Sequence, residues 1–445
     1  MEHSFIRVQE VEGTFVHNNP LPVLKGKCCA EFPVVCRATR QKLCMPEAAL
    51  DKGVLMMGRP GMGKSTVIAA LLRQLNQQMT NRDIMLVLDP KGEYYTAFGQ
   101  EGDIRLGAGT NSAPNVRWSL FKDLSAGVHT EGELRQRCAM VAKNCLVTLE
   151  NANQPFFTEA PRAAAENLLY LALHKPTVLP GSQLSNEAFV ELVESGRYDH
   201  AIAAARNLPG VSGALQELLG LDDNANATQL SIRMELKVNV AASLKHFNRG
   251  APRSAPLFSA VQAVRRREGK RIFLQYDLSA GNTTAAATAS ILDLVVQTAF
   301  EKKTEDGGRV ILALDEMPQL GPCFRETLAK ASSVGRSFHL TIITGVQCLT
   351  QMIEVYTETS AKALMNNFQT QLHFATGDPD SEEYIRRQVG NIMVENSRLV
   401  PGLGLRRGAM EMTSALTDET LGTMNVGDCV VLQTGAKPCL VHFEH

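Results

Sequence analysis

The strongest constraint on the fold is the run Gly58-Arg59-Pro60-Gly61-Met62-Gly63-Lys64-Ser65, which has the pattern G-x-x-x-x-G-K-S. It follows the apolar run Val54–Met57 and opens a segment whose apolar residues recur at three- and four-residue steps up to Met79. A strand, a glycine loop and a helix in this order predict a P-loop, which binds phosphate through backbone N–H groups and the helix N-terminus. A glycine turn in another kind of α/β protein is the alternative, and the flanking strand and helix disfavour it.

We predict that this loop binds ATP and Mg²⁺. Lys64 is expected to reach the β- and γ-phosphates and to be catalytic, and the Ser65 hydroxyl is expected to hold Mg²⁺. The predicted nucleotide-binding residues are Gly58, Arg59, Pro60, Gly61, Met62, Gly63, Lys64, Ser65 and Thr66.

A second acidic element follows the apolar run Val310–Leu314, which ends in Asp315-Glu316. This is the pattern of a Walker B strand. Asp315 is predicted to orient Mg²⁺ through its water shell, and Glu316 to polarise the attacking water. The alternative is an acidic strand end that faces solvent. Two consecutive acidic residues favour ATP hydrolysis over phosphoryl transfer to a small acceptor.

Two later residues fit the remaining catalytic roles. Gln347 follows the predicted strand 340–344, expected next in the sheet after the Asp315 strand, where a polar side chain can contact the γ-phosphate or the attacking water. Arg336 lies at the end of the helix predicted after Asp315 and could serve as an arginine finger for a neighbouring subunit. The alternative for each is an ordinary surface or capping residue.

The rest of the pattern predicts an α/β fold with a largely parallel, doubly wound sheet. Predicted strands are Val54–Met57, Ile84–Leu88, 271–276, Val310–Leu314, 340–344, 371–375 and 429–433. We predict four parts: a small, partly β lead-in (1–50), a first nucleotide-binding part (51–130), an inserted all-α domain without strands (131–262), and a second nucleotide-binding part (263–445). Residues 97–120 are expected to be rich in loops. Predicted helices of the insertion cover 135–149, 160–173, 186–196, 198–207, Val211–Leu219 and 229–246.

Composition sets further bounds. The net charge of −1 indicates no global basic surface, so nucleic acid would need a local patch or an assembled ring. The ten cysteines lack zinc-site spacing, which favours reduced thiols over a metal site. No stretch of about 18 apolar residues or signal peptide is visible, so we expect a soluble cytoplasmic protein, possibly recruited to the membrane by a partner.

Four stretches together resemble one family. They are the P-loop; Asp89-Pro90-Lys91-Gly92-Glu93-Tyr94; the series 314–321, Gly335-Arg336 and 345–347; and the closing stretches 416–417, 427–432 and 435–438. From about residue 50 to the end, the chain resembles type IV secretion coupling proteins, the TraG/TraD-like conjugative DNA-transfer ATPases of the FtsK–HerA superfamily. The resemblance implies a RecA-like P-loop fold and an all-α insertion that receives cargo. One departure is the lack of the transmembrane helices with which these proteins usually begin.

The resemblance also implies a mechanism. A hexameric ring would hold ATP between subunits, with hydrolysis sensed by Gln347 and completed by Arg336, and would move along single- or double-stranded DNA. The expected partners are DNA, a relaxase or effector cargo, and separate anchor or channel proteins. The densest basic cluster is a candidate DNA contact, with a solvated helix end as the alternative; it comprises Arg265, Arg266, Arg267, Lys270 and Arg271.

Three functions therefore stay open at this point. The first is a DNA translocase that couples relaxase-bound DNA to a conjugation channel. The second is a cargo-receptor ATPase without motor activity, and the third is a HerA-like ATPase of a mobile element or defence system. A small-molecule kinase is disfavoured, because no acceptor-site motif is visible and Glu316 suits water.

Overall fold

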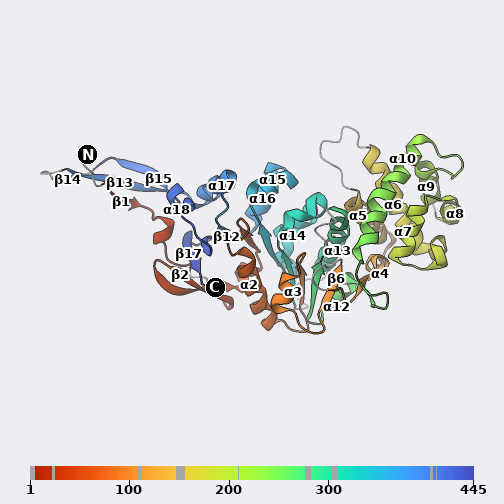
Figure 1. Ribbon diagram of the computed structural model, residues 1–445, viewed down its shortest axis with the longest axis horizontal. Coiled ribbons are helices and arrows are strands. Elements are labelled where there is room, and N and C mark those ends of the chain that lie inside the picture. The colour runs from red at the N-terminus through yellow and green to blue at the C-terminus, as the bar shows by residue number, and fades with distance from the viewer. Residues whose placement is uncertain are drawn as a thin grey trace. The chain divides into compact units, whose positions relative to one another are not determined.

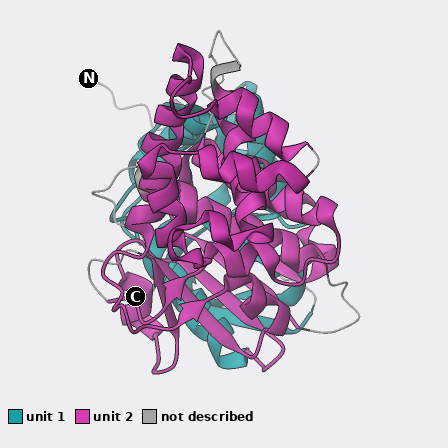
Figure 2. Ribbon diagram, turned by 90° about the vertical axis from the view of Figure 1, so that its right-hand side faces the viewer, with its two compact units in different colours: residues 1–78, 341–445 teal, residues 79–340 magenta. Residues whose placement is uncertain are grey.

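The computed structural model describes residues 6–22, 26–107, 113–146, 156–208, 210–275, 282–301, 308–400, 404–406 and 408–444. The chain divides into two compact units, and Figure 2 colours them separately. Unit 1 consists of residues 1–78 and 341–445, and unit 2 of residues 79–340. Within the described residues, no helix combines the length and the apolarity that a membrane span requires.

The strands of unit 2 are parallel and lie in the order β6 (Ile104–Gly107), β9 (Lys270–Gln275), β5 (Ile84–Leu88) and β10 (Val310–Leu314). Every residue of β5 and β10 is buried. A strand buried on both faces needs a continuous run of apolar residues instead of alternating apolar and polar ones. Such a continuous run predicted both of these strands. Tyr276, the predicted end of β9, lies outside the described residues.

The helices of unit 2 fall into two groups. One group comprises α3 (Glu93–Phe98), α4 (Leu120–Ser125), α12 (Ala260–Arg266), α13 (Asn282–Phe300) and α14 (Arg325–Val334), with the 3₁₀ turns η8 (Met317–Phe324) and η9 (Gly335–Phe338). The others gather beyond them, to one side of the strands (Figure 1), and are listed next. They are α5 (Glu131–Cys145), α6 (Phe156–His174), α7 (Asn186–Ser195), α8 (Asp199–Ala204), α9 (Val211–Leu219), α10 (Ala227–Glu235), the π-helix η5 (Leu236–Ala241), α11 (Ala242–Phe247), and the 3₁₀ turns η2 (Pro176–Val178), η3 (Pro180–Ser182) and η4 (Ala205–Asn207).

One local prediction for this unit is wrong. The segment 131–262 contains a strand, β8 (Leu257–Phe258), which pairs in parallel with β7 (Arg117–Trp118). The stretch 97–120, expected to be rich in loops, also holds the short strands β6 and β7 between its turns. Such short strands carry too few residues for an apolar pattern; the pairing rests instead on backbone bonds such as Arg117 N–H to Pro256 O at 2.9 Å. The bounds of the predicted domains, including 131–262, stay a prediction, and predicted helical residues 147–149 lie outside the described residues.

The main sheet of unit 1 has a parallel centre and an antiparallel extension. Its order is β3 (Thr39–Pro46), β2 (Cys28–Cys36), β17 (Cys439–Phe443), β16 (Asp428–Gln433), β12 (Thr370–Phe374), β4 (Val54–Met57) and β11 (Leu340–Val346). The β12–β4 and β4–β11 pairs are parallel, and the pairs from β12 outward to β3 are antiparallel. The helices are α1 (Glu47–Leu50), α2 (Lys64–Gln78), α15 (Leu349–Val355), α16 (Glu358–Asn367), α17 (Pro379–Val389) and α18 (Asp418–Gly422), with the turn η1 (Val16–Asn18).

A second, smaller sheet of unit 1 joins distant parts of the chain. β13 (Asn391–Val400) pairs with β1 (Ile6–Glu12), β14 (Gly404–Arg406) and β15 (Met410–Ser414), in each case antiparallel. One face of this sheet has a small core in which Ile392, Val394 and Ala415 are buried, and Phe15 packs against it.

The N-terminal cysteines differ from the prediction of reduced thiols. Cys28 and Cys44 form a disulfide with a Cα–Cα distance of 5.8 Å. The reason lies in the β2–β3 hairpin, where Cys28 is opposite Pro46 and Cys44 is opposite Glu31, so the two cysteines are close cross-strand neighbours. The other eight cysteines, all within the described residues, take part in no disulfide.

Candidate active site

The P-loop in unit 1 is anchored to the strands on both sides of β4. The Gly58 N–H donates to Val346 O at the end of β11 (3.1 Å), and the Arg59 N–H donates to Ala375 O just after β12 (3.0 Å). A side chain at position 58 would bring a Cβ within 2.7 Å of the Phe374 Cβ, so glycine is required there by close packing. The loop therefore leaves the sheet in a position that its neighbours define.

Glycine is required elsewhere in the loop for its backbone angles. Gly61 has φ +83° and Gly63 has φ +98°, a region that other residues rarely adopt. A Cβ at Gly61 would meet no atom within 4 Å, so backbone angle rather than crowding selects glycine at this position. A loop with these turns, leading into the N-terminus of α2, has the open backbone that phosphate binding needs. The loop residues thus fit a nucleotide phosphate.

Lys64 opens α2 and is almost fully buried, with 6% of its surface exposed. Its Nζ donates to Val346 O at 3.3 Å. Val346 directly precedes Gln347. The Gln347 side chain is half-buried, and the Gln347 N–H donates to Gln351 Oε1 at 3.3 Å. The structure therefore brings Lys64 close to the start of the Gln347 segment, and both belong to unit 1.

In unit 2, Asp89 organises the segment that follows β5. Its carboxylate accepts hydrogen bonds from the backbone N–H groups of Tyr95 (2.8 Å) and Tyr94 (3.1 Å), at the start of α3. Burial raises the pKa of Asp89, and these backbone hydrogen bonds oppose the rise. Gly92 precedes the helix with φ +72°, which glycine tolerates. The Asp-Pro-Lys-Gly-Glu segment is thus a tight turn that caps α3.

This turn places Tyr94 against Asp315. The Tyr94 hydroxyl donates to Asp315 Oδ2 at 2.6 Å, and both side chains are buried. Asp315 Oδ1 accepts from the Glu316 N–H at 3.0 Å. Each oxygen of Asp315 therefore has a donor that restricts its orientation. This role of Tyr94 was not predicted from the sequence, although Tyr94 directly follows the Gly92-Glu93 pair, which was a usable signal.

Glu316 has an unusual backbone conformation. Its φ of +56° and ψ of +42° lie in the left-handed region, which is uncommon for residues other than glycine and often marks functional sites. The side chain is half-buried and accepts a hydrogen bond from Gln319 Nε2 in η8. The left-handed turn at Glu316 thus lets two consecutive acidic side chains take different partners: Asp315 binds Tyr94, and Glu316 binds Gln319.

The model of the family described as "Type IV secretion-system coupling protein DNA-binding domain" matches residues 37–423, which is most of the chain. The chain belongs to this family. The resemblance inferred from its motifs is therefore confirmed.

Individual relatives are distant. The conjugal transfer protein TraG of Rhizobium radiobacter is 24% identical over 151 residues, and TraG of Agrobacterium fabrum is 23% identical over 154 residues. Each match covers 34% of this coupling protein and 23% of the relative, so the matched part spans about a quarter of the relatives' length.

Solved structures agree in fold over nearly the whole chain. Plasmid coupling protein TrwB in complex with the ATP analogue ADPNP has a TM-score of 0.69 at 17% identity, covering 98% of this chain and 94% of TrwB. VirB4 of Thermoanaerobacter pseudethanolicus has a TM-score of 0.54 at 13% identity, covering 96% and 98%. The predicted fold class, an α/β P-loop NTPase with a largely parallel sheet, is confirmed.

Arg336 of this coupling protein is exposed in η9, after α14. Within the described part of the chain, its backbone carbonyl accepts a hydrogen bond from the His339 N–H, and no hydrogen bond or ion pair is found for its guanidinium group. An exposed guanidinium is compatible with a contact to another subunit. The roles of Arg336 and Gln347 stay predictions.

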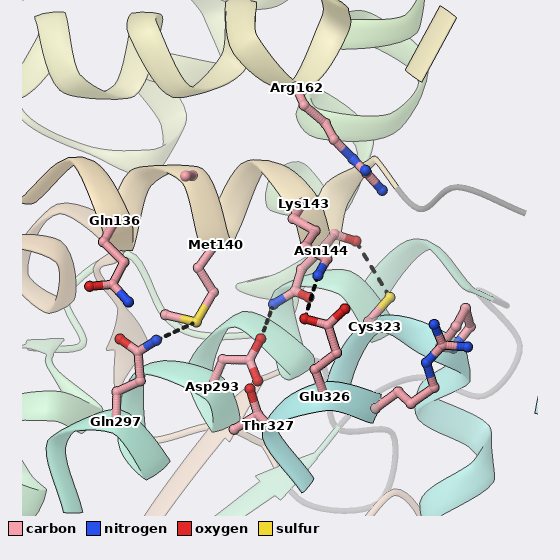
Figure 3. A pocket seen from close by; sticks show the side chains of 13 residues that line it. Gln136, Met140, Lys143, Asn144, Arg162, Asp293, Gln297, Cys323, Glu326 and Thr327 are labelled. Carbon is pink, nitrogen blue, oxygen red and sulfur yellow. Dashed lines mark hydrogen bonds and ion pairs between the residues drawn. The ribbon is translucent and has the colours of Figure 1, made fainter. Parts of the chain in front are cut away.

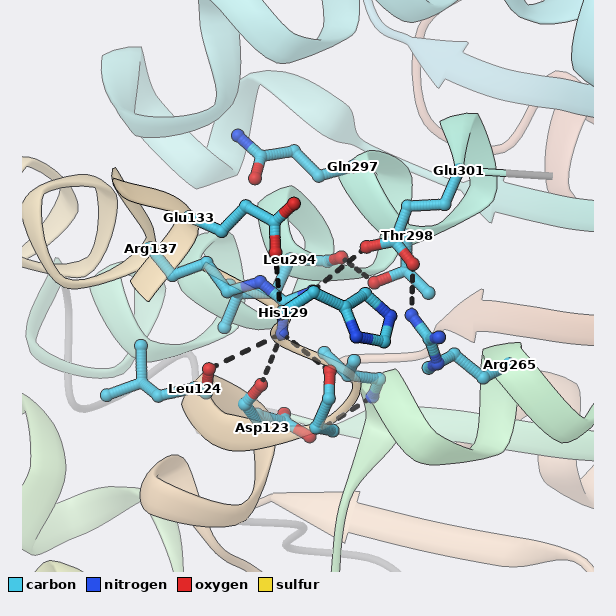
Figure 4. Close-up of polar contacts among 12 residues, drawn as sticks. Asp123, Leu124, His129, Glu133, Arg137, Arg265, Leu294, Gln297, Thr298 and Glu301 are labelled. Carbon is cyan, nitrogen blue, oxygen red and sulfur yellow. Dashed lines mark hydrogen bonds and ion pairs between the residues drawn. The ribbon is translucent and has the colours of Figure 1, made fainter. Parts of the chain in front are cut away.

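The fold supplies partners for most cations of the basic cluster, and the role of this cluster as a DNA contact stays a prediction. Arg265 pairs with Glu301, which also accepts from Arg137 at 3.0 Å (Figure 4). Two more cations form ion pairs, Arg271 with Asp103 and Lys270 with Glu268. The buried Arg267 donates a hydrogen bond to the backbone oxygen of Gly308. Three of these five cations are therefore paired with carboxylates, whereas the carbonyl of Gly308 accepts a hydrogen bond from Arg267 without neutralising its charge.

Proposed function

We propose that this coupling protein binds ATP and Mg²⁺ at Gly58 to Thr66, hydrolyses ATP, and uses the energy to move DNA. In this way it would deliver relaxase-bound DNA or protein cargo to a conjugation or type IV secretion channel. The observation that carries the proposal is the P-loop, in which a buried Lys64 opens α2 directly after the Gly61 and Gly63 turns. The complexes of the relative TrwB with an ATP analogue, and with ADP and Mg²⁺, support the choice of ligands.

The proposed chemistry assigns one task to each residue. Lys64 binds the β- and γ-phosphate oxygens as a fixed positive charge. Ser65 and Asp315 hold Mg²⁺, which neutralises charge on the phosphate oxygens when bound. Glu316 accepts a proton from the attacking water, and Gln347 contacts the γ-phosphate or that water. Arg336 completes the site of a neighbouring subunit in a hexameric ring.

A cargo-receptor function has its own support in the α10 region of unit 2. The side chains of Leu230, Met234 and Val238 recur at four-residue steps along α10 and η5, and each is more than half exposed. Exposed apolar residues that are neighbours on one face of a helix are typical of surfaces that contact other proteins. This surface fits the relaxase or effector cargo proposed for the helical segment, whether or not the protein also moves DNA.

DNA is expected to stimulate ATP turnover of the purified protein. The measurement is phosphate release with and without single- and double-stranded DNA. If at least two phosphates are contacted, DNA affinity should fall about tenfold between about 50 and 200 mM salt. Turnover that is indifferent to both forms of DNA would contradict the motor proposal and favour the cargo receptor. The Arg266→Ala variant tests the basic cluster in the same assay, since it removes an exposed cation of that cluster, and loss of stimulation would support a DNA contact there.

Replacing Tyr94 by phenylalanine is expected to slow ATP turnover about tenfold, because a hydrogen bond to a charged group contributes on the order of 1.5–3 kcal/mol. The phenyl ring keeps the packing of α3, so the melting temperature should change little. The discriminating measurement is the Mg²⁺ concentration for half-maximal turnover, which should rise if Tyr94 positions Asp315. Normal Mg²⁺ dependence in this variant would show that the hydroxyl has only a structural role.

A further inference from the structure

A polar cavity of about 570 Å³ opens in unit 2 where α5, α13 and α14 meet (Figure 3). Its size lies within the range of small-ligand sites. No residue of the predicted active site lines it. The side chains used below are Lys143 and Asn144 of α5, Arg162 of α6, Asp293 of α13 and Glu326 of α14.

Asp293 is the least satisfied polar group of this cavity. Only 3% of the residue is exposed. Its Oδ2 accepts a hydrogen bond from Asn144 Nδ2 at 2.7 Å, whereas its Oδ1 has no hydrogen-bond partner among the described residues. Burial raises the pKa of Asp293 to about 6, although the neighbouring Thr327 and Asn144 side chains favour the charged form. A buried acceptor without a donor is costly, and such groups commonly mark a missing ligand or water.

Two of the cations that line the cavity, Lys143 and Arg162, are engaged with other groups. Lys143 Nζ pairs with Glu326 at 2.6 Å, and this bond lowers the pKa of Glu326. Arg162 donates to Leu146 O at 2.6 Å and pairs with Glu159. Figure 3 shows the Lys143–Glu326 pair beside Asp293, with no cation on the Asp293 carboxylate itself. The unmet need of the cavity is therefore a positively charged donor.

Other lining groups can accommodate such a donor. Gln297 Nε2 contacts the Met140 sulfur at 3.3 Å, a weak acceptor that the amide can exchange for a better one. Burial raises the pKa of the Cys323 thiol to about 12, so this group stays neutral and does not compete as an anion. At Asp293 the ligand would thus meet a carboxylate beside neutral polar groups, while Arg162, Arg325 and the Lys143–Glu326 pair form other parts of the wall.

We propose that this cavity binds a positively charged nitrogen group, a guanidinium or a primary ammonium, that donates to Asp293 Oδ1. Two sources share this chemistry: an arginine or lysine side chain of a protein partner, and a free small molecule such as a polyamine. The cavity wall includes the start of α14, which follows Asp315-Glu316 and η8 along the chain. A ligand bound in this cavity is expected to alter ATP turnover through α14 and η8, a consequence that rests on the proposed function.

Calorimetry with the full chain tests the site. The probes are L-argininamide, spermidine, and an acetylated Ala-Arg-Ala amide, with L-citrulline amide as the uncharged counterpart of argininamide. We expect the cationic probes to bind, citrulline amide to bind at least about tenfold more weakly, and Asp293→Asn to lose at least about tenfold in affinity. Preference for the tripeptide indicates a protein side chain, and preference for spermidine indicates a free polyamine.

Several results would overturn the proposal. They are no binding of any cationic probe, equal binding of citrulline amide, and undiminished binding to Asp293→Asn. The exposed Asp223→Asn is the matched control for loss of a carboxylate and should bind normally. If Asp293→Asn fails to fold, Glu326→Gln is the second variant: it releases Lys143, which is then free to pair with Asp293, and binding should weaken.

Binding should also depend on pH. Because Asp293 must be ionised, argininamide affinity is expected to be about tenfold higher at pH 8 than at pH 5, with most of the change near pH 6. The other charged groups facing the cavity are Lys143, Arg162, Arg325 and Glu326, with Cys323 neutral. A pH-independent affinity overturns the role of Asp293. Since calorimetry needs no ATP hydrolysis, failure of this site and failure of the proposed function are distinguishable.

Discussion

ATP turnover of the Lys64→Ala variant is expected to fall by at least about 10²–10³-fold, the usual loss when one donor to a developing charge is removed. In the structure, Lys64 opens α2 and its Nζ is 3.3 Å from Val346 O, so the ammonium group is held at the loop rather than free in solvent. Alanine keeps the helix and removes only this charge. Phosphate release and equilibrium binding of a fluorescent ATP analogue would measure the change.

The control for this variant is Lys237→Ala, which removes an exposed lysine of η5 far along the chain from the loop. It should keep normal turnover. Lys64→Ala should also melt near the temperature of the unaltered protein, because it removes a buried charge together with the contacts that its ammonium makes. A variant that folds and still hydrolyses ATP at more than about a tenth of the normal rate would contradict the assignment of Lys64 as the phosphate-binding lysine.

Glutamine at position 316 is expected to slow hydrolysis by about 10²–10⁴-fold while leaving ATP binding within about threefold of normal. Glutamine has nearly the shape of glutamate and keeps an oxygen that can accept from Gln319, but it cannot take a proton from water. Single-turnover hydrolysis separates the chemical step from product release, and nucleotide binding is measured in parallel.

Glu354→Gln, an exposed position in α15, is the matched control and should hydrolyse ATP normally. If Glu316→Gln loses ATP binding as well as hydrolysis, Glu316 acts on the shape of the loop and not as a base. If it loses neither, the left-handed backbone at Glu316 serves only the turn into η8.

Much of the fold could be predicted from local patterns. The runs Ile84–Leu88 and Val310–Leu314 predicted two strands with correct bounds, because strands buried on both faces carry unbroken apolar residues. The two-residue strand β8 was missed for the opposite reason, since its pairing depends on a distant segment and leaves no periodic signal. Helices α5 to α11 follow predicted helical segments, but the bounds of the inserted domain stay a prediction.

Errors in the site came from partners that are distant in sequence. The basic run near Arg266 is one case, since the fold supplies Glu301, Asp103 and Gly308 O as partners for its neighbours, while its role as a DNA contact stays a prediction. The Cys28–Cys44 disulfide is a similar case, since only the β2–β3 pairing brings the two thiols together. Charge and spacing along the chain cannot reveal such pairs.

The sequence by itself determined the P-loop, the acidic pair Asp315-Glu316 and the family, because glycine angles and short apolar runs act within a few residues. Only the tertiary structure decided that Tyr94 holds Asp315, at a separation of 221 residues, and that Asp293 is buried with one oxygen unbonded. The physical reason is that hydrogen bonding and the pKa of a buried group depend on what the whole fold packs around it. Local patterns therefore predicted the parts of the site, and long-range packing decided their partners.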